Sequence, residues 1–267
     1  MVSGLRMSRL RIAIAGLLAA VAPAAAQRPS EADAAAAIEK SRAVALDYSK
    51  SLPDFVCTET IERFWELPAG RNWLPTDTLT VSLSYFEQKE DHKLVLVNGA
   101  PAQISYGALQ GAVGVGEFGG TLSSIFDPVS EAHFHWESWK TVRKHPAAVY
   151  SYAVEPAHSR YAIATGTPGK IQRDIVGYHG VVEVDRESGA VLHFTYQADH
   201  IPRSLDLDYA LTTVDYDLTG VNGRNYWLPA TSETESRGPR MRMLNKAEFR
   251  QYRKFGSEST LTFDPGK

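Results

Sequence analysis

The stretch at residues 178–202 constrains the fold most, because two runs of alternating apolar and polar side chains flank a short polar turn at residues 186–189. Alternation with a period of two predicts strands with one buried and one solvated face, and so short a turn joins them as an antiparallel hairpin. Asp185 and Gly189 are residue types favoured in turns, which explains their positions at the two ends of this turn. We therefore expect a wall of antiparallel sheet here. The side chains expected on its inner side are Val182, Val184 and Phe194.

The N-terminal residues have the composition of a signal peptide. Three arginines precede an apolar run at residues 12–21 that is too short to span a bilayer, and three alanines at residues 24–26 suit cleavage. We expect cleavage before Gln27 and removal of residues 1–26, with Met7 as an alternative start and an uncleaved anchor as the alternative reading. The mature chain is then periplasmic or secreted and has no transmembrane helix.

The charge balance argues against nucleic acid as a partner. The chain has 28 basic and 31 acidic residues, and the expected signal peptide contains three of the bases and no acid, which leaves 25 against 31. A mildly acidic chain has no electrostatic attraction for a phosphate backbone or an anionic membrane surface.

One helix and a long series of strands are expected. Small and apolar side chains recur at spacings of three and four between Ser30 and Pro53, with Ser30 and Asp33 as a capping pair and Pro53 as the stop. After Asp54 the period is two, and Cys57 is expected to be a buried strand residue. Beside the hairpin, the expected strands are 79–85, 94–97, 132–139, 149–155, 161–165, 211–218, 226–233, 242–255 and 259–263, with a helix at 245–250 as an alternative.

This order of elements predicts a mainly β chain of the α+β class. One small-faced helix and about ten strands fit an N-terminal helix packed on a curved antiparallel meander sheet, as a half-barrel or barrel. Residues 27–267 form a single β-rich domain in this interpretation, since no linker divides them.

Residues 107–128 interrupt the strands with six glycines. The spacing Gly114-x-Gly116-x-x-Gly119 matches a dinucleotide fingerprint, but neither a core strand before it nor a long helix after it is expected. We interpret residues 107–128 as a mobile flap with a short helix at 121–126 and an apolar underside, which closes over a cavity and gates it.

The sequence resembles two groups of proteins. The phrases LPDFVCTE, GEFGGTLSSIFDP and VDY, at residues 52–59, 116–128 and 214–216, resemble exported bacterial proteins of unassigned activity. The hairpin sequence from Val182 to Val191, followed by another strand pair, is similar to the lipoprotein-carrier group, the LolA and RseB-like proteins. That resemblance implies a concave half-barrel sheet whose apolar hollow holds acyl chains or a lipidated protein.

Aromatic side chains at alternating positions of neighbouring strands, together with the underside of the flap, indicate where a ligand would lie. A single helix with a slim face cannot cover ten strands, so the sheet either closes on itself or leaves a hollow. Core packing alone is the alternative explanation for the same pattern. The candidate lining residues are Phe118, Leu122, Ile125, Phe126, Phe134, Trp136, Tyr150, Tyr152 and Phe194.

A metal site is a weaker candidate. His133, His135 and Glu137 occupy alternate positions of one expected strand and so share a face, on which two imidazoles and a carboxylate could bind zinc. The competing interpretation is the solvated face of a strand whose other face is Phe134 and Trp136. No cofactor or catalytic residue is predicted.

The leading hypothesis is therefore a non-enzymatic exported binding protein that takes an apolar or acylated ligand, a lipid or a lipoprotein, in a concave hollow. One alternative is an envelope protein-interaction or sensing domain without a small ligand. The other is a metal-dependent hydrolase that uses the two histidines and the glutamate.

Overall fold

A computed structural model describes residues 29–67, 70, 72–109, 116–167 and 170–256. The expected signal peptide and the expected strand at 259–263 lie outside these residues. Among the described residues, no helix has the length and apolar character needed to cross a membrane.

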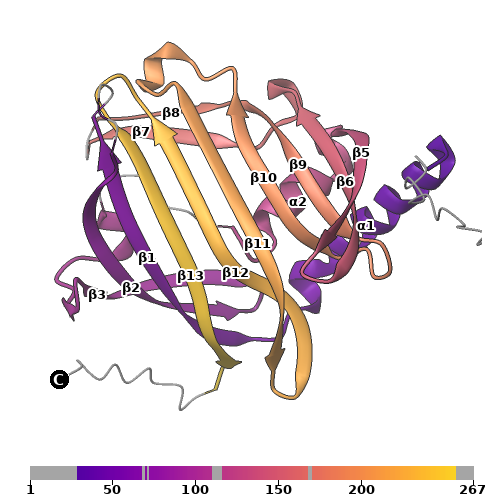
Figure 1. Cartoon of the computed structure of the whole chain (residues 1–267). Helices are drawn as coiled ribbons and strands as arrows, with labels where there is room; N and C mark the ends of the chain where they lie inside the picture. The colour runs from indigo at the N-terminus through magenta and orange to yellow at the C-terminus, as the bar shows by residue number, and fades with distance from the viewer. Residues whose placement is uncertain (1–28, 68–69, 71, 110–115, 168–169, 257–267) are drawn as a thin grey trace, which may run out of the picture.

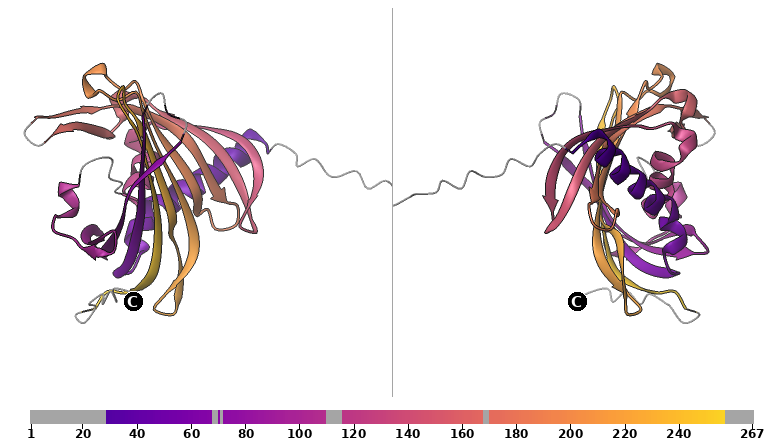
Figure 2. Two further views of the ribbon diagram at one scale, coloured as in Figure 1. Left: turned by 60° about the vertical axis from the view of Figure 1, so that its left-hand side comes forward. Right: turned by 90° about the vertical axis from the view of Figure 1, so that its right-hand side faces the viewer.

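Helix α1 (Glu31–Ser51) forms as the sequence predicts. The Ser30 hydroxyl accepts a hydrogen bond from the Asp33 backbone N–H at 3.1 Å, and the helix ends at Leu52 before the proline. Its buried face is the expected slim one, with Ser41 and Ala45 between larger side chains, and it packs on the sheet. Figure 2 shows α1 and the short helix α2 (Gly120–Phe126) on the same side of the sheet.

The rest of the described chain is mainly antiparallel β-sheet, which confirms the expected fold class. Eleven strands form one open sheet and two form a separate hairpin (Figure 1). The strands are β1 (Phe55–Glu66), β2 (Leu74–Phe86), β3 (Lys89–Val97), β4 (Ala100–Pro101), β5 (His133–Val142), β6 (His145–Val154), β7 (Ala162–Thr167), β8 (Lys170–Ile175), β9 (Gly177–Asp185), β10 (Val191–Asp199), β11 (Tyr209–Val221), β12 (Arg224–Arg237) and β13 (Arg242–Lys254). Single 3-10 turns are η1 (Tyr106–Ala108), η2 (Pro128–Ser130), η3 (Pro156–His158) and η4 (Arg203–Leu205).

The strand order differs from a simple meander. It runs β4-β3-β2-β1-β13-β12-β11-β10-β9-β6-β5, so the first and last strands pair in the middle of the sheet and β4 and β5 form its two edges. The chain must therefore cross from one edge to the other between β4 and β5. The described parts of the glycine-rich segment, residues 107–109 and 116–128, belong to this crossing, which explains why they lack strand periodicity. Residues 110–115, with Gly114 of the fingerprint spacing, lie outside the described residues.

The turns follow the predicted chemistry. Asn98 with Gly99, and Asn222 with Gly223, have positive φ angles, as two-residue hairpin turns require. In the 186–189 turn, the Asp185 carboxylate accepts hydrogen bonds from the backbone N–H groups of Glu187 and Ser188. These local signals set the register of the hairpins.

Three details differ from the sequence expectations. Strand β3 begins at Lys89, because the turn before it contains only Glu87 and Gln88, both with positive φ. Strand β8 was not predicted, since its six exposed side chains include no inward-facing set. Residues 245–250 form part of β13, so their helical alternative is wrong.

Candidate functional site

The nine predicted lining residues lie between the sheet and its covering helices: five point from strands β5, β6 and β10, and the other four belong to α2 and the segment just before it. Seven are buried in one core cluster, and Phe134 and Trp136 pack against its margin. The ring of Phe126 stacks on that of Phe134 with ring centroids 5.2 Å apart. The ring centroids of Phe134 and Tyr152 are 5.9 Å apart. The sequence therefore identified the inner face of the sheet, where these side chains occupy much of the space between the helices and the strands.

Hydrogen bonds from the sheet and α1 hold the segment 117–126 in place. The hydroxyls of Tyr216 and Tyr178 donate to the carbonyls of Glu117 and Ser124, each at 2.7 Å, and the Arg42 guanidinium donates to the Phe126 carbonyl. A Cβ at Gly119 would lie 2.9 Å from the Ser49 Cβ on α1, so only glycine permits this close approach. The short helix predicted at 121–126 is confirmed and is fixed from both sides.

An apolar cleft of about 260 Å³ remains between α1 and the β11–β12 hairpin. The hydroxyl of Tyr48 on α1 donates a hydrogen bond of 2.7 Å to the carbonyl oxygen of Trp227, and Tyr48 forms part of the cleft wall. Leu218 is 46% exposed, and Leu122 is the predicted lining residue that belongs to this wall. The lining residues are Val44, Ala45, Tyr48, Ser51, Leu52, Leu122, Ala190, Val191, Leu218, Asn225, Tyr226 and Trp227.

A second, polar hollow of about 20 Å³ lies on the same face between β1, β12, β13 and the segment around η1. The buried carboxylates of Glu59 and Glu117 line it. The Ser232 hydroxyl donates to Glu117 Oε1 at 3.3 Å, and the Glu90 carboxylate accepts from the backbone N–H groups of Gly116 and Phe118. The carboxylate of Glu117 is therefore close enough to those of Glu59 and Glu90 for electrostatic repulsion.

Burial makes these carboxyl groups weak acids. Desolvation raises the pKa of Glu117 to about 7, with repulsion from Glu90 as the next cause. Burial raises the pKa of Glu59 well above its ordinary value, and repulsion from Glu117 adds to this. Desolvation also raises the pKa of Glu90 and lowers that of His92 on the same strand.

Sequence reasoning missed this acidic cluster, although one signal was present. The period of two places Glu59 on the same face as Phe55, Cys57 and Ile61, and the structure buries all four. Cys57 is buried, as the sequence predicts. An acid on an apolar strand face is uncommon and therefore informative.

The metal candidates lie on the edge strand β5. His133 and His135 are exposed, and a β-bulge falls at Glu137, whose carboxylate accepts a hydrogen bond from Ser151 at 2.6 Å. Within the part of the chain that the structure describes, no three histidine, cysteine, aspartate or glutamate side chains are grouped to hold a metal ion.

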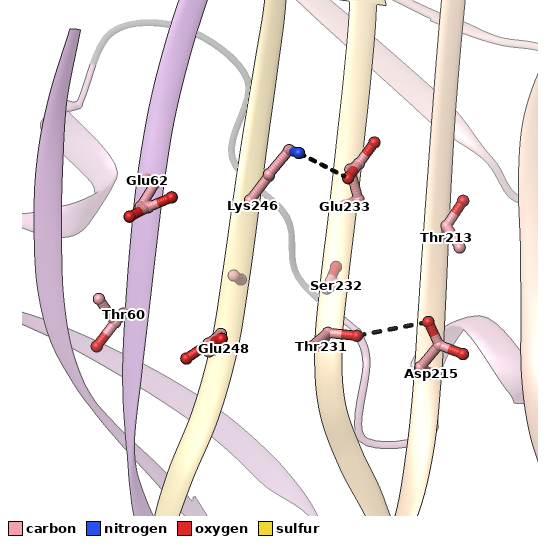
Figure 3. Close-up of a pocket in the computed structure, with 10 residues that line it drawn as sticks. Thr60, Glu62, Thr213, Asp215, Thr231, Ser232, Glu233, Lys246 and Glu248 are labelled. Atoms are coloured by element: carbon pink, nitrogen blue, oxygen red, sulfur yellow. Dashed lines mark hydrogen bonds and ion pairs between the residues drawn. The ribbon is translucent and has the colours of Figure 1, made fainter. Parts of the chain in front are cut away.

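The opposite face of the sheet has a shallow polar groove of about 470 Å³ across β1, β13, β12 and β11 (Figure 3). Its side chains pair with each other: Lys246 lies 3.7 Å from Glu233, and Thr231 donates to Asp215 at 3.4 Å. Most of these groups are exposed or half-exposed, as expected for the solvated face of an antiparallel sheet.

Comparison with known proteins gives remote structural likenesses only. No family model and no curated protein sequence matches the chain. A DUF1329 family protein from Desulfovibrio piger matches at 12% identity and a TM-score of 0.38, over 85% of this chain and 94% of the other. A LolA superfamily protein from Nitrosomonas europaea matches at 8% identity and a TM-score of 0.31, over 84% and 94%.

A domain from Vibrio parahaemolyticus, described as a candidate outer membrane lipoprotein-sorting protein, matches at 12% identity and a TM-score of 0.35, over 84% of this chain and 92% of the other. The resemblance to the LolA group that the sequence suggests is thus found among solved structures. At these TM-scores it remains a resemblance and supports no inference about ligand or activity.

Proposed function

We propose that this chain is an exported binding protein that takes an acyl chain, from a lipid or a lipidated protein, in the cleft between α1 and the β11–β12 hairpin. The supporting observation is the cleft itself: about 260 Å³ of space lined mainly by apolar side chains, with the half-exposed Leu218 among them. Ligand sites are typically concave and apolar with a few polar groups. Here Ser51, Asn225 and the Tyr48 hydroxyl supply the polar groups.

The energetics of an apolar cleft predict a dependence on chain length. Each buried methylene stabilises a complex by about 0.8 kcal/mol, or about fourfold in affinity. About six methylenes would contribute about 5 kcal/mol, against at least about 4 kcal/mol for the lost freedom of the ligand. We therefore expect weak binding of short chains and a steep rise with length until the cleft is full.

A series of fatty acids of increasing length, titrated by calorimetry, tests the proposal. Val44→Trp fills the cleft from α1 and should weaken binding at least tenfold, whereas Ala43→Trp, on the exposed side of the same helix, should leave it unchanged. Mass spectrometry of the native protein should detect a carried lipid or lipopeptide.

Affinity that does not depend on chain length, or equal binding by the two tryptophan variants, would contradict the proposal. Crosslinking in cells that captures one envelope protein and no lipid would instead favour an interaction or sensing domain.

A further inference from the structure

The polar hollow beneath η1 is distinct from the apolar cleft, and the acids that line it have few basic partners among the described residues. Within 4.0 Å of the Glu59 carboxylate, the described residues provide one basic side chain, His92, whose Nε2 lies 3.8 Å from Glu59 Oε2. That distance is too long for a hydrogen bond. Among the described residues, Oε2 of Glu59 is buried without a hydrogen-bond partner, although the residue is only 3% exposed and lines the hollow.

The neighbouring charges do not neutralise the cluster. Arg63 also lines the hollow, but its guanidinium is engaged by Asp77 through two hydrogen bonds, at 2.6 and 2.5 Å. Desolvation lowers the pKa of His92, which favours its neutral form, and its ring stacks on Tyr106. Among the described residues, the titratable groups near the site are Cys57, Glu59 and Arg63 on β1, Asp77 on β2, Glu90 and His92 on β3, Tyr106 in η1, Glu117 before α2, Tyr216 on β11 and Tyr252 on β13.

A buried carboxylate oxygen without a donor is unfavourable unless a proton or a cation joins it. The size and lining of the hollow limit the cation. Its volume of about 20 Å³ admits one head group the size of a water molecule, and its walls combine oxygens of Glu59, Glu117, Ser232, Thr234 and Asn245 with the apolar side chains of Ile61, Leu79, Leu109 and Ala247. An ammonium group donates three hydrogen bonds, which suits a wall rich in acceptors.

We propose that this hollow binds a primary ammonium group, held by the carboxylates of Glu59 and Glu117 with the hydroxyls of β12. A guanidinium or a quaternary ammonium is too large for the space. The described residues also lack a group of three acidic, histidine or cysteine side chains suited to a metal ion. Because the hollow is separate from the apolar cleft, this proposal does not depend on acyl binding.

Methylammonium chloride serves as the probe on the full mature chain, with sodium and tetramethylammonium chloride at equal ionic strength as comparisons. We expect methylammonium alone to raise the thermal unfolding temperature in a saturable manner at pH 8. Calorimetry in two buffers should show proton release on binding, and an affinity at least tenfold lower at pH 5.5, because protons then occupy the same carboxylates.

Glu59→Gln should fold, since it replaces a buried acid by a neutral polar side chain of the same size, and should weaken methylammonium binding at least tenfold. Glu62→Gln, on the exposed face of the same strand, is the matched control and should bind as the wild type does. The proposal is wrong if sodium or tetramethylammonium stabilises the chain as much as methylammonium does, or if Glu59→Gln binds equally well.

Discussion

Ionisation of Glu117 should make the protein less stable as the pH rises. The Glu117 side chain is buried, and its pKa rises from an ordinary value of 4.5 to about 7 in the folded state. The folded chain therefore binds the proton more tightly than the unfolded chain does. The bound proton stabilises the folded state fully below pH 4.5, and this stabilisation is lost as the pH rises through 7. The free energy of unfolding should fall by about 3 kcal/mol over this range.

Glu117→Gln isolates this contribution. The amide oxygen can still accept the hydrogen bond from Ser232, but the side chain no longer ionises. We expect the variant and the wild type to have similar free energies of unfolding at pH 4.5, and the variant to be about 3 kcal/mol more stable at pH 8. Urea denaturation in sodium buffers at pH 4.5 and pH 8 measures the free energy of unfolding of the variant and of the wild type.

Glu62→Gln, on the solvated face, is the control and should follow the wild type. The pH dependence of Glu117→Gln should be reduced rather than abolished, because Glu59 and Glu90 also have raised pKa values. If the wild type and Glu117→Gln lose the same stability between pH 4.5 and pH 8, the assignment of a buried, weakly acidic Glu117 is incorrect.

Three further substitutions test the packing by urea denaturation. Phe126→Ala removes a fully buried ring from α2 and should cost about 3–5 kcal/mol; a loss below 1 kcal/mol would show that α2 is not docked as described. Tyr216→Phe leaves the Glu117 carbonyl without its donor and should cost about 1–3 kcal/mol, whereas an unchanged midpoint would argue against that hydrogen bond. Gly180→Ala would place a Cβ 2.0 Å from the Thr195 carbonyl oxygen, so we expect at least about 1–3 kcal/mol of destabilisation, and wild-type stability would contradict the β9–β10 register.

Local signals in the sequence were sufficient for the elements that depend on local chemistry. The α1 helix has its cap, its stop and its small-residue face in contiguous sequence, and the Asn-Gly turns determine their hairpins without help from distant residues. The inner face of the sheet could also be predicted, because alternation assigns each strand residue to one face.

The arrangement of the strands could not be read in the same way. The pairing of β1 with β13 joins residues nearly two hundred positions apart, and no local pattern specifies it. The cleft likewise arises where α1, a turn beside Ala190 and the β11–β12 hairpin meet, so of the nine predicted lining residues it includes Leu122 alone. Strand β8 could not be predicted from the sequence, because both of its faces are exposed and its side chains show no alternation of apolar and polar residues.

The acidic cluster shows what a pattern of apolar residues leaves out. The period of two assigns Glu59 to a strand, and the glycine content assigns Glu117 to the glycine-rich segment, but neither pattern indicates that an acid is buried. The two meet only because the crossing from β4 to β5 brings Glu117 against β12, where Ser232 contacts it.

Fluorescence quenching by a brominated fatty acid tests the central claim most directly, because bromine quenches tryptophan only at close range. Trp227 lines the cleft and is one of five tryptophans in the chain. We expect saturable quenching of the wild type, and loss of most of it in Trp227→Phe while calorimetry still detects binding. Quenching that is absent, or unchanged in Trp227→Phe, would show that acyl chains do not enter the cleft between α1 and the β11–β12 hairpin.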